Sequence, residues 1–162
     1  MDKQYFVESL EKCRSYGDIF DLVKKSVKKI LGLHRAGLIL YLENLPVNIG
    51  AYYQVGSNGI VLNKSLISLM GKSLMSRIEF NSLIFFLLLH EYLHSLGFLD
   101  EEEVRRIVYE ISVKTFGKNH PAAKIALEPP LINIPAPYEW GLLNHDVEIV
   151  KDFERIKDSY IA

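Results

Sequence analysis

The chain has 162 residues, of which 49% are hydrophobic and 24% charged, and its 19 basic and 20 acidic side chains leave a formal charge of −1. This length fits one domain that buries about two-thirds of the surface its unfolded form exposes. The composition excludes a disordered chain, and the near-zero charge gives no sign of a nucleic-acid partner. With a single cysteine, Cys13, and no apolar N-terminal segment, we expect a cytoplasmic protein without disulfides.

The N-terminal part predicts two amphipathic helices. Residues 2–15 form the first, and Gly17 is expected to break it. Asp18 is then expected to cap a second helix over residues 19–31. Lysines line the outer side of this second helix without interleaved aromatic residues, which favours a solvated face over a binding face.

The pattern then changes to short apolar segments that predict strands. These segments are residues 37–42, 51–55 and 60–63. The turn between the last two, residues 56–59 (GSNG), is typical of a hairpin because Gly and Asn accept positive φ. Residues 64–74 predict a short helix.

The next helix is the best defined in the sequence. Ser76 and Glu79 form a capping box at its start, and Gly97 is a natural stop. Residues 83–89 are a continuous apolar run, much shorter than the 20 or so residues of a membrane span. We therefore expect a central buried helix and no membrane partner.

The C-terminal part predicts two more helices, over residues 101–116 and 121–127, and a final helix over 146–158. Residues 128–140 (EPPLINIPAPYEW) contain four prolines and are expected to be extended. The predicted organisation is therefore one domain over residues 1–127, with 128–162 packed on it as a proline-rich segment and a helix.

One motif on the central helix carries chemistry. Residues 90–94 (HEYLH) match H-E-x-x-H, and positions i and i+4 share one helix face. His90 and His94 can therefore bind one zinc ion, while Glu91 is placed to act as general base and acid on a metal-bound water. Burying these groups without a metal or partners would cost several kcal/mol.

This segment resembles the active-site helix of the zincin metallopeptidases, and the resemblance covers about residues 37–116. It implies a zincin-like α/β (α+β) fold, with a small mixed sheet and an edge hairpin packed on the central active-site helix, plus surrounding helices. It also implies that backbone groups near residues 51–55 pair with a bound peptide.

The resemblance extends downstream of the motif. His94-Ser-Leu-Gly97-Phe-Leu-Asp100 is similar to the metzincin pattern H-x-x-G-x-x-H/D, which implies Asp100 as third zinc ligand. Metzincins have a methionine in a tight turn below the metal, but all three methionines here lie upstream of the motif. The alternative is a gluzincin-like site, with a glutamate from a following helix as third ligand.

The third ligand is the open question of the site. Asp100 and Glu103 also match a capping box, which is a structural role for both residues. The other candidates for this ligand are Glu101, Glu102, Glu103, Glu110, His120 and His145.

Some residues are candidates by side-chain type only. An oxyanion donor is expected in a peptidase, and the candidates are Tyr52, Tyr53, Tyr138 and His145. Each is more readily explained as a packing or surface residue. Cys13 is more readily explained as a small buried residue than as a zinc ligand.

The leading hypothesis is a zinc-dependent metallopeptidase that acts on a peptide or protein substrate. The alternative is a latent or catalytically silent protein of the same fold, with a binding or regulatory role, in which residues 128–140 could fill the cleft. A metal-dependent RNA-processing enzyme fits less well, because Glu91 has no counterpart there and basic residues are few.

Overall fold

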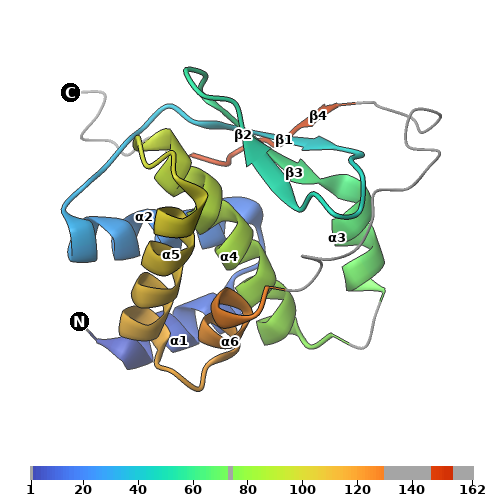
Figure 1. The fold of residues 1–162 in the computed structure, drawn as a ribbon. Helices are drawn as coiled ribbons and strands as arrows, with labels where there is room; N and C mark the ends of the chain where they lie inside the picture. Colours follow the sequence, from blue (N-terminus) through green and yellow to red (C-terminus); the bar gives the residue numbers. More distant parts are fainter. Residues whose placement is uncertain (1, 73–74, 130–146, 155–162) are drawn as a thin grey trace.

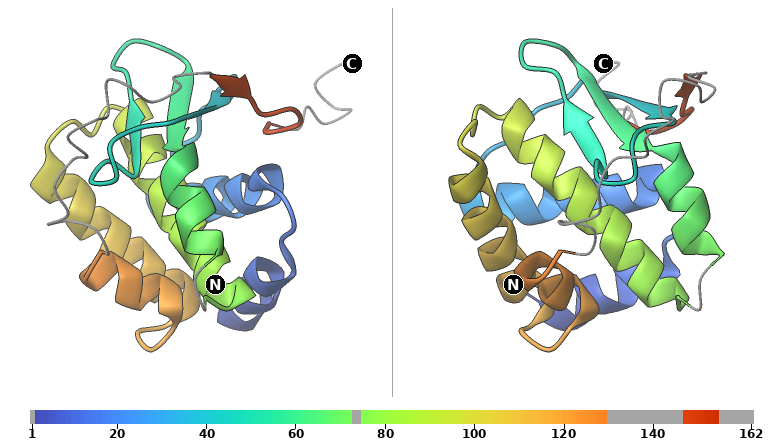
Figure 2. Two further views of the ribbon diagram at one scale, coloured as in Figure 1. Left: turned by 90° about the vertical axis from the view of Figure 1, so that its right-hand side faces the viewer. Right: turned by 45° about the vertical axis from the view of Figure 1, so that its right-hand side comes forward.

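The computed structural model describes residues 2–72, 75–129 and 147–154. The helices of this part are α1 (Lys3–Lys12), α2 (Tyr16–Leu31), α3 (Lys64–Gly71), α4 (Arg77–Ser95), α5 (Glu101–Phe116) and α6 (Pro121–Leu127). Its strands are β1 (Ile39–Glu43), β2 (Ala51–Tyr53), β3 (Gly59–Asn63) and β4 (Glu148–Ile149). The sheet forms one layer and the helices lie against it in a second (Figure 1; Figure 2). This confirms the predicted mixed α/β fold with a small mixed sheet.

The sheet has the strand order β2-β3-β1-β4. β1 and β3 are parallel, whereas β2 pairs antiparallel with β3 as the predicted hairpin. The turn of the hairpin contains Gly56 at φ +86°, a value that favours glycine. Among the described strands β2 therefore lies at an edge, and none of them pairs with its outer side.

α4 is the central element of the fold (Figure 1). It contacts β2 and β3 above it and α1, α2, α5 and α6 around it. Its capping box is present, since Ser76 accepts from the Glu79 N–H and Glu79 accepts from the Ser76 N–H. Phe85 and Leu88 are fully buried, as the apolar run predicts, and so is Tyr92 beyond the run. In the described part of the chain, no helix is long and apolar enough to cross a membrane.

The start of α2 differs from its prediction. Gly17 does not lie between the two helices but in the first turn of α2. Ser15 is the N-cap in place of Asp18. The Ser15 side chain accepts from the Asp18 N–H at 3.0 Å. A Cβ on Gly17 would lie 2.4 Å from the carbonyl oxygen of Asp152, so glycine here permits a close backbone contact that the sequence did not reveal.

The described end of the chain also differs. The helix expected over residues 146–158 is wrong in its described part, where Glu148 and Ile149 form β4 and pair antiparallel with β1. The N–H of Val150 then donates to the carbonyl of Leu40 at 2.9 Å. The open edge of β1 explains this outcome, because an unpaired strand edge recruits another extended segment. The proline-rich residues 130–140 lie outside the described residues, and the domain boundaries stay a prediction.

Candidate metal centre

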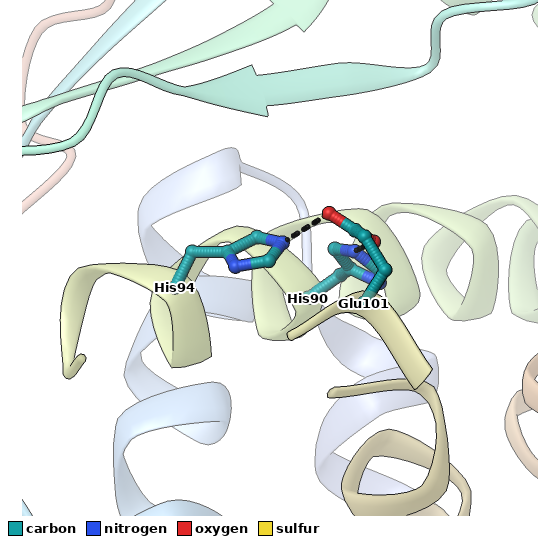
Figure 3. A group of neighbouring side chains, drawn as sticks. All are labelled: His90, His94 and Glu101. Carbon is teal, nitrogen blue, oxygen red and sulfur yellow. Dashed lines mark hydrogen bonds and ion pairs between the residues drawn. The ribbon is translucent and has the colours of Figure 1, made fainter. Parts of the chain in front are cut away.

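Three side chains converge where α4 ends and α5 begins (Figure 3). His90 and His94 lie one turn apart on α4, with ring centroids 4.9 Å from each other. Glu101, the first residue of α5, places Oε2 at 2.9 Å from Nε2 of His90 and Oε1 at 2.8 Å from Nε2 of His94. These ligand atoms all lie within 4.8 Å of one another, which makes this a group that could hold a metal ion.

The turn between the helices brings Glu101 back toward the histidines. Gly97 has φ +105°, and its N–H donates to the carbonyl of His94 at 3.0 Å. The N–H of Phe98 donates to the carbonyl of Leu93 at 3.1 Å. This pair of bonds is a Schellman motif, which ends α4 at the position predicted from Gly97 and reverses the chain.

The same turn also orients a histidine. The carbonyl oxygen of Phe98 lies 2.7 Å from Nδ1 of His94 and can only accept, so Nδ1 carries the proton. A neutral His94 then directs the lone pair of Nε2 toward Glu101. A lone pair and a carboxylate oxygen at 2.8 Å repel each other unless a cation lies between them. The distance is that of a hydrogen bond, so these two atoms share a proton as long as no metal ion is bound.

Asp100, the expected third ligand, is not part of this cluster. It is the N-cap of α5, and its Oδ2 accepts from the Glu103 N–H at 3.1 Å. The group that converges contains Glu101, one of the stated alternatives, and does not contain Asp100. Of the remaining alternatives, Glu110 pairs with Lys114 at 2.8 Å on the same helix.

Glu91 is held next to this group but faces the sheet. It is 6% exposed, and its carboxylate accepts from the backbone N–H of Tyr53 on β2. Burial raises the pKa of Glu91 to about 8, and the negative charge of Glu101 adds to the rise. The Glu91 carboxyl thus carries a proton near neutral pH until a nearby cation favours its ionised form.

Burial also lowers the pKa of His90, and it outweighs the opposite effect of Glu101. The positive charge of Arg105 contributes in the same direction as burial. A neutral imidazole is the form that binds a metal. The surroundings therefore keep His90 in its metal-binding form.

A pocket opens beside the three residues. One side of it is α4, and the other is the chain that leads into β2, at Asn48, Gly50 and Ala51. The side chain of Glu101, one of the lining residues, is 59% exposed. The pocket gives a bound molecule access to the cluster.

Arg35, which the sequence did not single out, ties the sheet to α4. Its guanidinium donates to the Tyr53 hydroxyl at 3.1 Å, the Ser57 carbonyl at 2.9 Å and the Ser95 carbonyl at 2.7 Å. Its backbone N–H donates to the Tyr92 hydroxyl at 2.9 Å. We call this set of contacts the Arg35 clamp. It fixes Tyr53, the residue whose N–H binds Glu91, and no local sequence signal predicts it.

The residues proposed by type only lie apart from the cluster or outside the described part. Tyr52 bonds to Glu43, and the Tyr53 hydroxyl donates to the Ser57 carbonyl. Cys13 is buried, as expected. His120, a stated alternative for the third ligand, is the N-cap of α6. Tyr138 and His145 lie outside the described residues.

Scans of protein-family models, of curated proteins and of solved structures find no match to this chain. The resemblance to the zincins therefore rests on residues 90–94 and on their setting.

Proposed function

We propose that this protein is a zinc-dependent metallopeptidase that hydrolyses peptide bonds at the cluster of His90, His94 and Glu101. The observation that carries the proposal is the convergence of two imidazole nitrogens from α4 and one carboxylate from α5, with Glu91 next to His90 on α4. Two histidines and one carboxylate are a ligand set of catalytic zinc sites, which need three protein ligands and one open position.

The donor set supports zinc on chemical grounds. Imidazole nitrogen suits zinc better than it suits magnesium or calcium, which prefer oxygen ligands. The proton on Nδ1 of His94 leaves Nε2 free to coordinate. The hydrogen bond from Nδ1 to the carbonyl of Phe98 makes Nε2 more basic. The exposed side of Glu101 leaves room for a substrate.

In this proposal, bound zinc would lower the pKa of a water molecule and polarise the substrate carbonyl. Glu91 accepts a proton on a carboxylate oxygen as water attacks, and it delivers that proton to the nitrogen of the leaving amine. The Tyr53 N–H holds the carboxylate in place for both transfers. The outer edge of β2, which pairs with no other described strand and lies close to α4, offers backbone groups to an extended peptide.

The first prediction concerns Glu91. Replacing it (Glu91→Gln) should lower peptide hydrolysis by about 10²–10⁴-fold, the usual contribution of a general base. Zinc should stay bound, because Glu91 is not among the three ligands. The measurement is turnover of a peptide mixture by zinc-loaded protein, with metal content determined on the same samples.

Glu102→Gln is the matched control, because Glu102 is exposed on α5 and outside the cluster. Hydrolysis at the wild-type rate in Glu91→Gln would show that Glu91 is not the general base. Wild-type protein that binds zinc and cleaves no peptide would favour the binding or regulatory alternative.

A further inference from the structure

The pocket beside the cluster has a wall that suits an apolar side chain. This wall is one face of α4, at positions i, i+3, i+4, i+7 and i+8. The residues are Leu83, Phe86, Leu87, His90 and Glu91. Three apolar side chains therefore lead up to the two polar residues at which the proposed reaction takes place.

The other lining residues include Asn48, Gly50, Ala51 and Pro129. Gly50 runs so close to α4 that a Cβ on it would lie 2.7 Å from a methyl carbon of Leu87. Ala51, next in the chain, begins the edge strand β2. An extended peptide that pairs with this edge points alternate side chains toward α4. One of them would enter the pocket, where Phe86 and His90 of α4 are among the lining residues.

A single arginine distinguishes this pocket. Arg105 lies one turn after Glu101 on α5, and it is the only Lys or Arg among the described residues that line the pocket. Within the described part of the chain, Arg105 forms no ion pair, whereas other cations such as Lys25 and Lys114 pair with acids on their own helices. Its guanidinium is therefore available to an anion in the pocket.

We propose that the pocket selects a peptide with an apolar side chain, placed against α4, and a carboxylate next to it, bound by Arg105. The carboxylate is either a free C-terminus or an acidic side chain, since guanidinium binds both in the same bidentate way. This inference rests on the proposed function, because it assigns the substrate class of the same site.

The test uses short peptides that share one leucine and differ in charge. One pair ends in a free carboxylate or an amide, and a second, amidated pair carries Glu or Gln after the leucine. Binding is measured by calorimetry to zinc-loaded Glu91→Gln protein, and cleavage is measured with zinc-loaded wild type. A carboxylate-bearing peptide should bind about 10-fold more tightly than its neutral partner. The pair that shows the preference identifies the source of the carboxylate.

Arg105→Gln, introduced into both proteins, should remove this preference and leave the binding of the neutral peptides unchanged. Arg106→Gln is the control, because Arg106 is exposed on the same helix but does not line the pocket. Equal binding of charged and neutral peptides would overturn the inference. An equal loss of affinity for all four peptides in Arg105→Gln would also overturn the inference.

The two proposals fail in different ways. Cleavage by the wild type with no preference in either pair would refute the subsite and leave the peptidase intact. A clear preference in binding, abolished by Arg105→Gln, with no cleavage by zinc-loaded wild type would support the subsite and refute the peptidase.

Discussion

His90 and His94 differ in how their rings are fixed. The ring of His94 is held by a 2.7 Å hydrogen bond to the Phe98 carbonyl, which sets both its orientation and its tautomer. The ring of His90 packs near Phe86, at 6.1 Å between centroids. Because Phe98 belongs to the turn after α4, this turn positions His94 as well as Glu101. The turn is thus part of the candidate site.

His120, which lies outside the cluster, is expected to make the stability of the fold depend on pH. His120 accepts the Ala122 N–H at Nδ1, at 3.0 Å, and so caps α6. Burial lowers its pKa below the ordinary 6.5. As the pH falls below 6.5, the unfolded chain takes up the proton first, so stability is full above this pH and is lost as the pH falls through the folded pKa. The loss should be about 1 kcal/mol, the value of a helix cap.

The measurement is the free energy of unfolding at pH 5 and pH 8. His120→Asn is the control, because Asn caps helices and does not titrate. The wild type should lose more stability than this variant between the two pH values. The same pH dependence in both proteins would exclude His120 as its source.

At the scale of elements, the Arg35 clamp joins three segments that are distant in the sequence. They are the chain before β1, the β2–β3 hairpin and the C-terminal end of α4. The bond to the Ser95 carbonyl also satisfies a group that a helix end leaves free. Since Tyr53 both belongs to the clamp and binds Glu91, the clamp keeps β2 at the distance that Glu91 requires.

Arg35→Gln should therefore lower the free energy of unfolding by about 2 kcal/mol, because three hydrogen bonds from a charged group are lost. Amide exchange in the hairpin should accelerate more than exchange in the middle of α4. Chemical denaturation and hydrogen exchange measure the two effects. Arg106→Gln, an exposed control, should change neither. A wild-type exchange rate in the hairpin of Arg35→Gln would argue against the clamp.

For the molecule as a whole, the core does not depend on the cluster. The largest fully buried side chains include Phe20, Phe85, Leu88 and Tyr92, and they lie on α2 and α4. Phe20 packs edge-on against Tyr92 at 5.3 Å. His90, His94 and Glu101 are not among the buried residues. A chain of this length needs no metal to fold.

We therefore expect the protein to stay folded after zinc is removed with a chelator. Far-UV circular dichroism should keep its helical signal, and unfolding should remain cooperative. Zinc at 100 times its Kd should add about 2.7 kcal/mol of stability through binding to the native state alone. A loss of helical signal on chelation that zinc reverses would show that the metal is structural.

Local signals made α4 predictable from the sequence. The capping box, the apolar run and Gly97 all act within a few residues, and the i,i+4 spacing places His90 and His94 on one face. The hairpin is local in the same sense. β4 was not predictable, because it forms only where the edge of β1 is open to it.

The third member of the cluster also depends on more than spacing. Asp100 and Glu101 are adjacent, and which one faces the histidines depends on where α5 begins. Asp100 is extended, with ψ 121°, and turns its carboxylate toward the Glu103 N–H. Glu101 is the first helical residue and projects back to α4. One residue of difference in the helix start would exchange these roles.

Zinc binding to ligand variants distinguishes Glu101 from Asp100 as the third ligand. Calorimetric titration of the metal-free wild type should give one zinc ion per chain. Glu101→Gln should weaken zinc binding by more than about 100-fold, since even outer-shell partners of a ligand contribute 10–100-fold. Asp100→Asn, which keeps a capping side chain, should bind zinc like the wild type. Wild-type affinity in Glu101→Gln would show that Glu101 is not a ligand, and no zinc binding by the wild type would show that the cluster is not a zinc site.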